Sequence, residues 1–274
     1  MEALSIQMLG GLQLHRNGTE IPPFPTRKAA ALFSCLILQR GDSVHRNALC
    51  ARLWGDQPDR SARKSLRNAL WRVRQVIEPN RPGGDRYLRI DADRVGFRST
   101  ERTVVDVWEF LDVAERFEAV PLHRALSDTE VAVIERATAL YRGRLLAGES
   151  IIDDATVIEA ERVELLQIAL LERLVLHHRR LENWRAAASN GHQILRLDKC
   201  REHVHREVMA CYVGMGDRPG AIRQFNTCAD VLDRELGIEP MRETFDLIER
   251  IRTGEFSPRS DSQLRVPAIG SAGR

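Results

Sequence analysis

One segment of the chain combines basic and amide side chains without a single acidic residue, and it runs from Ser61 to Gln75. Apolar residues recur in it at the spacing of one helical face, which must pack against a core. Arginine, lysine, asparagine and glutamine are side chains that contact phosphates and base edges in the major groove of DNA. We therefore predict a DNA-recognition helix whose exposed face carries Lys64, Arg67, Asn68, Trp71, Arg72 and Gln75, with Arg63 and Arg74 at its flanks.

The alternative for this segment is an arginine-rich face that serves only solubility. An exposed helix usually mixes positive and negative side chains, because opposite charges three or four positions apart stabilise each other. The segment lacks such pairs, which favours binding of a polyanion.

The sequence gives little support for a metal site or for enzymatic activity. Cys200, His203 and His205 lie close together, with His177 and His178 upstream. On a helix His203 and His205 would point about 200° apart, so they cannot easily share one ion. The motifs G-x-S-x-G, H-E-x-x-H, G-x-G-x-x-G and G-x-x-x-x-G-K-[ST] are all absent from the sequence. We predict no metal site, no cofactor and no enzymatic activity.

The elements that must position the basic helix fit a winged helix-turn-helix. A hairpin turn is expected at Asn17-Gly18, because both residues tolerate positive φ. Thr26 is a good N-cap for a first helix, and Gly41 is a good residue to end it. The predicted DNA-binding domain spans residues 1–100, with extended segments at Leu4–Leu9 and Leu12–Arg16, helices at 26–41, 43–54 and 61–77, and a terminal hairpin of Tyr87–Ile90 and Val95–Arg98 around Asp91-Ala92-Asp93.

The rest of the chain is predicted to be helical, which makes the fold class mainly α with a small β component. Residues 181–187 and 216–222 align at an offset of 35, and each stretch is a turn between amphipathic helices. A period near 34 residues is typical of tetratricopeptide repeats, and an unrelated helical bundle is the alternative. We predict an all-α tetratricopeptide-like domain over 105–253 and a disordered tail over 254–274, with helices at 105–117, 127–141, 155–181, 184–197, 202–215, 219–236 and 241–251.

Charge divides the chain in the same way. Residues 1–100 carry 17 Lys and Arg and 9 Asp and Glu, a net charge of +8, whereas residues 101–274 carry a net charge of −6. A basic first domain suits a polyanionic partner. The five cysteines form no C-x-x-C pair and are expected to be reduced core thiols. With no secretory signal visible and no apolar run long enough to span a bilayer, we expect a cytoplasmic, nucleoid-associated protein and no membrane partner.

Short motifs recur in a specific order along both domains. The first domain has Leu9-Gly10-Gly11-Leu12, Arg27-Lys28-Ala29-Ala30-Ala31-Leu32, Leu53-Trp54-Gly55, Ser61-Ala62-Arg63 and Arg72-Val73-Arg74. The second has Val105-Asp106-Val107-Trp108-Glu109-Phe110, Tyr141-Arg142-Gly143, Glu159-Ala160-Glu161-Arg162 and Glu235-Leu236-Gly237-Ile238-Glu239-Pro240. Over residues 1–254 the chain thereby resembles the SARP-type bacterial regulators, in which an OmpR-like winged helix precedes a bacterial transcriptional activator domain.

The resemblance implies a transcriptional activator that binds double-stranded DNA at direct repeats near promoters and recruits RNA polymerase. It places the third helix in the major groove, through Lys64, Arg67, Asn68, Trp71, Arg72 and Arg74. Trp71 stands where the family commonly has a small polar residue, and it either packs on a thymine methyl or a sugar or covers a neighbouring helix. Only Arg89 and Arg94 are expected as contacts from the wing, because Asp91 and Asp93 would repel phosphate.

Two further expectations concern protein partners. In the family, the loop corresponding to Gly55–Arg60 contacts RNA polymerase, which here implies a role for Asp56 and Asp59. The simpler interpretation is that Asp59 or Ser61 caps the following helix. Direct-repeat sites also imply self-association of protomers on DNA. A function of another class stays open, a helical-repeat interaction scaffold with a purely structural winged helix, and salt-dependent DNA binding would separate the two.

Overall fold

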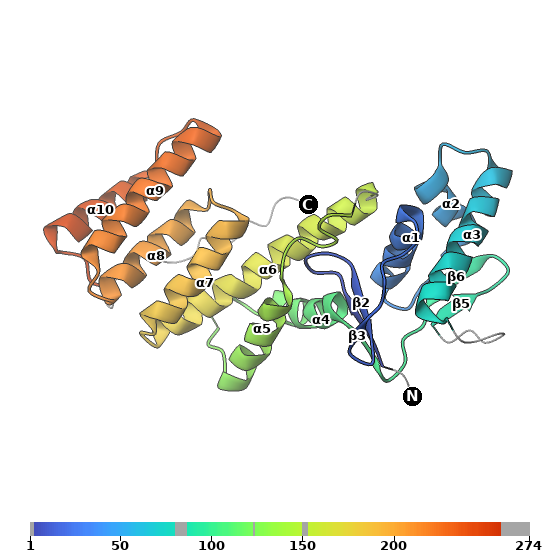
Figure 1. Cartoon of the computed structure of the whole chain (residues 1–274). Helices are drawn as coiled ribbons and strands as arrows, with labels where there is room; N and C mark the ends of the chain where they lie inside the picture. Colours follow the sequence, from blue (N-terminus) through green and yellow to red (C-terminus); the bar gives the residue numbers. More distant parts are fainter. Residues whose placement is uncertain (1–2, 80–86, 123, 150–152, 259–274) are drawn as a thin grey trace. The chain divides into compact units, whose positions relative to one another are not determined.

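The computed structural model describes residues 3–79, 87–122, 124–149 and 153–258 (Figure 1). The chain forms two compact units. Unit 1 comprises Met1–Arg116 and Arg136–Leu165, and unit 2 comprises Phe117–Glu135 and Leu166–Arg274. The boundaries of these units differ from the predicted boundary between the DNA-binding domain and the helical domain, at residues 100 and 105. The division into these two sequence domains stays a prediction.

A four-stranded sheet opens unit 1, in the order β3-β2-β1-β7. Strand β1 (Leu4–Gln7) pairs antiparallel with β2 (Gln13–Arg16) and parallel with β7 (Thr103–Val105), and β3 (Thr19–Glu20) pairs with β2. The hairpin turn predicted at Asn17 and Gly18 is confirmed, with φ values of 51° and 82°. Strand β7 was not predicted, because its partner lies about a hundred positions earlier in the chain.

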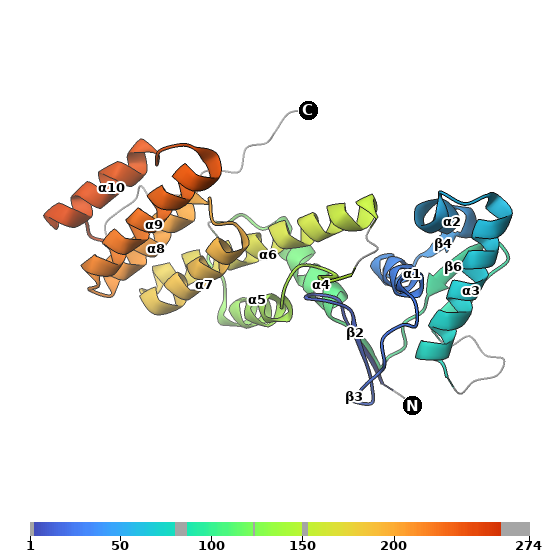
Figure 2. The same ribbon diagram turned by 45° about the horizontal axis from the view of Figure 1, so that its top comes forward.

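Three helices and a second sheet complete the winged helix-turn-helix (Figure 2). The helices are α1 (Arg27–Leu38), α2 (Arg46–Trp54) and α3 (Asp59–Ile77), and the second sheet has the order β4-β6-β5, with β4 at Ser43–His45, β5 at Leu88–Ile90 and β6 at Arg94–Phe97. Two predicted helix starts are corrected. Residues 43–45 pair with β6 instead of opening a helix, and α3 begins at Asp59, two residues before the predicted start at Ser61.

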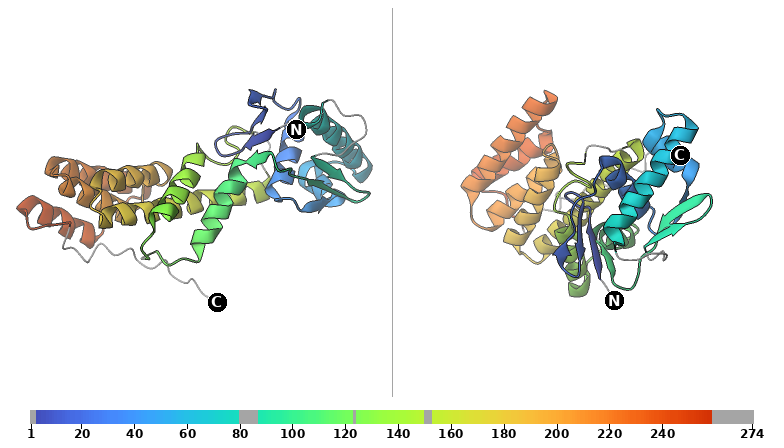
Figure 3. Two further views of the ribbon diagram at one scale, coloured as in Figure 1. Left: turned by 90° about the horizontal axis from the view of Figure 1, so that it is seen from below. Right: turned by 45° about the vertical axis from the view of Figure 1, so that its right-hand side comes forward.

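Contacts at the C-terminal end of α3 hold this helix and the β5–β6 hairpin (the wing) in place. The Arg16 guanidinium of β2 donates to the Val76 carbonyl oxygen at 2.8 Å. The buried Glu78 carboxylate, just after α3, accepts from the backbone N–H of Tyr87 at 2.5 Å and of Leu88 at 3.3 Å. In Figure 3 the wing lies beside α3. The orientation of the wing is thus set by the residue that ends the basic helix.

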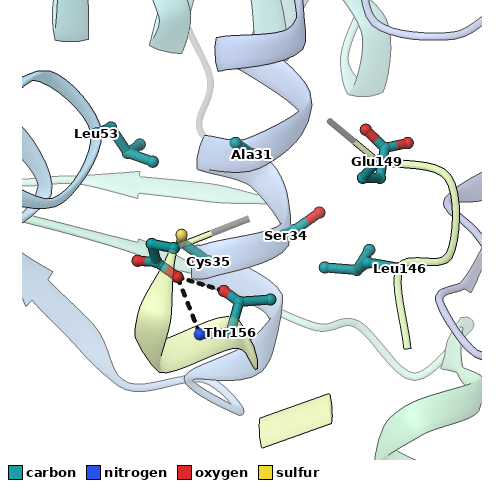
Figure 4. Close-up of a pocket in the computed structure, with 8 residues that line it drawn as sticks. Ala31, Ser34, Cys35, Leu53, Leu146, Glu149 and Thr156 are labelled. Atoms are coloured by element: carbon teal, nitrogen blue, oxygen red, sulfur yellow. Dashed lines mark hydrogen bonds between the residues drawn. The ribbon is translucent and has the colours of Figure 1, made fainter. Parts of the chain in front are cut away.

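Helix α2 is also tied to the start of α6 (Asp154–Arg180) within unit 1. The Arg52 guanidinium donates to Asp153 at 2.9 Å and to the Thr156 hydroxyl at 3.2 Å, and Thr156 donates to the same carboxylate from its N–H and its hydroxyl. These residues lie beside a cavity of about 10 Å³, too small for more than one water molecule, which Ser34 and Cys35 of α1 also line (Figure 4).

The helical part of the chain follows the predicted order. Helices α4 (Asp106–Glu118) and α5 (Asp128–Leu140) precede α6, and in unit 2 α7 (Trp184–Leu197) packs on α8 (Glu202–Gly214), which packs on α9 (Arg218–Leu236) and α10 (Arg242–Thr253). Gly191 allows the close approach of α7 to α8, because a Cβ there would come within 2.6 Å of Val208. The predicted tetratricopeptide-like architecture, mainly α with a small β component, is confirmed.

The repeat register differs by one residue from the predicted offset of 35. Asn183 and Asp217 accept from the N–H groups of Ala186 and Gly220, so they cap α7 and α9, and they lie 34 positions apart in the chain. The buried residues obey the same interval, since Ala187, Gly191 and Ile194 in α7 correspond to Ala221, Phe225 and Cys228 in α9. The predicted offset of 35 came from aligning the turns at residues 181–187 and 216–222, and not from aligning the caps and the buried residues.

All five cysteines are free, and Cys35, Cys50, Cys211 and Cys228 are buried. Burial raises the pKa of the Cys211 and Cys228 thiols to about 12, so both stay protonated. At the end of the chain, Phe256 is buried against α10, although it belongs to the predicted tail, and residues 259–274 lie outside the described residues. No helix in the described part of the chain is both long enough and apolar enough to cross a membrane.

Candidate nucleic-acid interface

Helix α3 has one apolar and one basic face. Its buried residues are Ala62, Leu66, Ala69, Leu70, Val73 and Ile77, which confirms the predicted stripe, with Val76 half-buried. Burial of each Leu, Val or Ile is worth about 1.5–3 kcal/mol, so this stripe holds the helix in the domain. The opposite face is therefore fixed in orientation and open to solvent.

The structure brings the central residues of the predicted site together on that open face. Lys64, Arg67 and Asn68 are exposed, one turn apart or adjacent along α3. Trp71 follows on the same face with 62% of its surface exposed. Neighbouring helices thus cover little of the indole, which favours the interpretation that it packs on a partner.

Arg72, predicted on the exposed face, and the flanking Arg63 and Arg74 are more constrained than the sequence indicated. Arg72 and Arg74 are half-buried, and the Arg74 guanidinium lies 3.8 Å from the Glu78 carboxylate. Arg63 is exposed and donates to the Asn47 side-chain oxygen at 3.5 Å. Arg63 therefore lies at the side of α3 that faces the start of α2, whereas Arg74 belongs to the connection with the wing.

Two residues missed by the sequence analysis extend this surface. Asn47 is exposed in the first turn of α2, where backbone N–H groups and the helix dipole favour an anion such as phosphate. The prediction had started that helix at Ser43, three residues early. Arg60 was assigned to a loop, but it lies in the first turn of α3, one turn before Lys64, and it is exposed. A correct placement of both helix starts would have identified the two residues.

The wing presents less positive charge than its arginines suggest. The Arg89 guanidinium lies 3.0 Å from the Asp91 carboxylate, and Asp93 lies 3.8 Å from the His45 ring. Arg94 donates to the Ser43 hydroxyl at 2.8 Å and also to the Ser43 carbonyl oxygen. Both arginines therefore already have partners within the domain. A role of Arg89 and Arg94 in binding DNA stays a prediction.

The acidic residues before α3 lie in different elements. Asp56 is exposed in the loop that follows α2, whereas Asp59 is exposed in the first turn of α3. Pro58 occupies the N-cap position, and no described side chain caps the helix, so the predicted cap by Asp59 or Ser61 is wrong. The negative charge of Asp59 still lies near the positive end of the helix dipole, which is worth about 0.3–1 kcal/mol.

The histidines considered for metal binding have other partners. The His203 ring lies 3.1 Å from the Glu172 carboxylate, and the His205 ring donates to the Lys199 carbonyl oxygen at 2.9 Å. Within the described ranges no group of three or more His, Cys, Asp or Glu side chains is arranged to hold a metal ion.

A winged helix-turn-helix followed by helical repeats defines a class of bacterial transcriptional regulators. The family model of the bacterial transcriptional activator domain matches residues 105–252. The chain belongs to this family, and it is a SARP-type regulator.

Two relatives that this chain matches are named as regulatory proteins. The chain is 29% identical to the regulatory protein DnrI of Streptomyces peucetius over 246 residues, which cover 86% of this chain and 88% of that protein. It is 25% identical to the regulatory protein AfsR of Streptomyces griseus over 273 residues, 97% of this chain but only 26% of that larger protein.

The fold has a counterpart among solved structures. The structure of Mycobacterium tuberculosis EmbR in complex with a low-affinity phosphopeptide matches with a TM-score of 0.68 at 18% identity, over 93% of this chain and 66% of that one. At this identity the likeness concerns the fold.

Proposed function

We propose that this chain is a sequence-specific transcriptional activator that binds direct repeats near promoters at the nucleoid and recruits RNA polymerase. The observation that carries the proposal is the open face of α3, where Lys64, Arg67 and Asn68 lie together and no carboxylate occurs between Ser61 and Gln75. Such a face can neutralise phosphates and donate to guanine and adenine edges at the same time. Arg60 and Asn47 extend it toward the two helix N-termini.

The proposal of direct-repeat binding rests on the resemblance to SARP-type regulators, and the small size of the reading domain supports the need for two protomers. A winged helix reads a short site with one helix, so two protomers in tandem are needed to read a longer one. Identical surfaces in the same direction along DNA give a head-to-tail contact between protomers, which is the proposed self-association.

The proposal is tested by capturing genomic DNA fragments on the purified full-length protein and sequencing them. We expect enrichment of promoter fragments that contain two copies of one short motif in the same orientation. Arg67→Ala should lose this enrichment, whereas Arg223→Ala, an exposed arginine of α9, should keep it. Equal enrichment by both variants would exclude α3 as the recognition helix.

Asp56→Ala is expected to lower transcription without lowering DNA affinity. Asp56 is exposed before α3 and outside the helix, so its loss should change neither folding nor the basic face. If the loop contacts RNA polymerase, removal of the carboxylate weakens recruitment by the loss of one charged contact, about 1–3 kcal/mol or roughly 5- to 150-fold.

A reconstituted transcription assay at saturating occupancy of the DNA site measures this effect. Glu20→Ala is a suitable control, because Glu20 is an exposed carboxylate in β3 of the same unit. Full transcription by Asp56→Ala, and also by an Asp56→Ala/Asp59→Ala double variant, would show that activation uses another surface.

A further inference from the structure

Unit 2 contains an open groove that the proposed DNA-binding function does not use. Its volume is about 530 Å³, and residues of α7, α8 and α9 line it. Helix α8 packs on both of the other helices (Figures 1 and 2). One side presents Ser189, His192 and Arg196, which recur at i, i+3 and i+7 on α7. The other side presents Gln224, Thr227 and Val231, with the same spacing on α9.

The polar groups at the base of the groove already have partners. The buried His205 ring donates from Nε2 to the Lys199 carbonyl oxygen at 2.9 Å, so its Nδ1 accepts from the Gln224 amide at 2.7 Å. The His192 ring lies 3.0 Å from the Tyr212 hydroxyl. Burial lowers the pKa of both histidines, so both rings are neutral at neutral pH. The base is therefore a fixed, uncharged surface.

Two exposed basic residues line the groove, and only Arg196 gives it an uncompensated positive charge. The Lys199 ammonium lies 2.6 Å from the Glu235 carboxylate, which neutralises it. Arg196 has no carboxylate partner among the described residues, and its guanidinium acts on His192 as a neighbouring charge. An arginine fork matches the two oxygens of a carboxylate. The exposed Ser189 hydroxyl adds a hydrogen-bonding group beside it, whereas the Thr227 hydroxyl already donates to the Arg223 carbonyl oxygen at 3.0 Å.

We propose that this groove binds an acidic peptide segment of a partner protein, with one of its carboxylates on Arg196. Charge complementarity selects the occupant, because the Arg196 charge has no carboxylate partner among the described residues and no Asp or Glu lines the groove. The shape favours a peptide over a small molecule, since small-molecule sites enclose most of their ligand, whereas stacked repeats present extended concave surfaces. Leu195 and Val231 supply apolar contacts for side chains that alternate with the acidic ones. The inference does not depend on DNA binding by α3.

A fluorescein-labelled hexapeptide of alternating glutamate and leucine is the probe, titrated with the full chain and followed by fluorescence anisotropy. We expect saturable binding that Arg196→Gln weakens at least tenfold, as for loss of a charge-assisted hydrogen bond. Thr227→Glu, which adds a carboxylate to the groove, should weaken it similarly. Arg223→Gln is the matched control, because Arg223 is exposed on α9 outside the groove, and it should bind as the wild type does.

The basic face of α3 is the competing site for an acidic probe, and Arg67→Gln distinguishes it. Binding unchanged in Arg67→Gln supports the groove. The proposal is overturned if the full chain does not bind the probe, if Arg196→Gln and Thr227→Glu bind it as tightly as Arg223→Gln does, or if Arg67→Gln is the variant that loses it.

Discussion

Asp106→Ala is expected to lower the free energy of unfolding of unit 1 by about 2–6 kcal/mol, because two buried backbone N–H groups lose their acceptor. The carboxylate is buried at the start of α4 and accepts from the backbone N–H groups of Met8 at 2.8 Å and Leu9 at 3.1 Å, just beyond β1. The Arg142 guanidinium donates to the same group at 2.6 Å. Alanine would leave two buried N–H groups without an acceptor, each costing about 1–3 kcal/mol.

Thermal unfolding followed by circular dichroism measures this effect, and a loss of this size corresponds to a decrease in Tm of about 10 °C. Asp112→Ala is the matched control on the same helix. Its carboxylate is 65% exposed and pairs with Arg40 at the surface, so its loss should cost less than about 1 kcal/mol. Equal Tm values for the two variants would contradict the role of Asp106.

Arg67→Ala is expected to weaken binding to the specific DNA site by about 1–3 kcal/mol, or roughly 5- to 150-fold, while leaving the fold intact. Arg67 is exposed at the centre of the basic face, with its backbone held by buried Leu66 and Leu70 on the other side of α3. Arg72→Ala should also weaken binding. Because Arg72 is half-buried, part of its effect should appear as lower stability.

Titrations at several salt concentrations separate the two kinds of contact that Arg67 can make. Loss of a phosphate contact reduces the slope of log K against log salt by about one, whereas loss of a base contact reduces discrimination between sites. Arg223→Ala serves again as the control. Wild-type affinity in both Arg67→Ala and Arg72→Ala, with normal circular dichroism, would rule out α3 as the recognition element.

Helices with a long periodic pattern and hairpins of neighbouring strands around a turn could be predicted from the sequence, whereas strands β4 and β7, whose partners are distant, could not. Helix α7 begins and ends at the predicted residues, and the buried stripe of α3 was correct, because both helices carry several turns of apolar periodicity. Strands β4 and β7 have three residues each. Three residues show no usable alternation, and the partners that define these strands, β6 and β1, are distant in sequence.

The residues of the candidate site also divide into those that the sequence could predict and those that it could not. The members of the basic face follow from helical spacing alone, so Lys64, Arg67 and Asn68 could be grouped before the structure was known. Asn47 could not, because its place depends on a strand that ends just before α2. Nor could Asp106 be assigned its role, since a carboxylate near a predicted helix start gives no sign of partners 97 and 98 positions away. The groove in unit 2 could not be predicted either, because it forms only where α7 and α9 pack on α8.

The ratio of affinities for the captured repeat site and for a scrambled sequence of equal length and composition, at one salt concentration, tests the central claim most directly. Because base contacts by α3 are proposed to specify the site, we predict a ratio of at least about 10³ for the full chain. The Arg67→Ala/Arg72→Ala double variant should bring it close to one. A wild-type ratio near one, or an unchanged ratio in the folded double variant, would contradict the claim that this face of α3 reads DNA sequence.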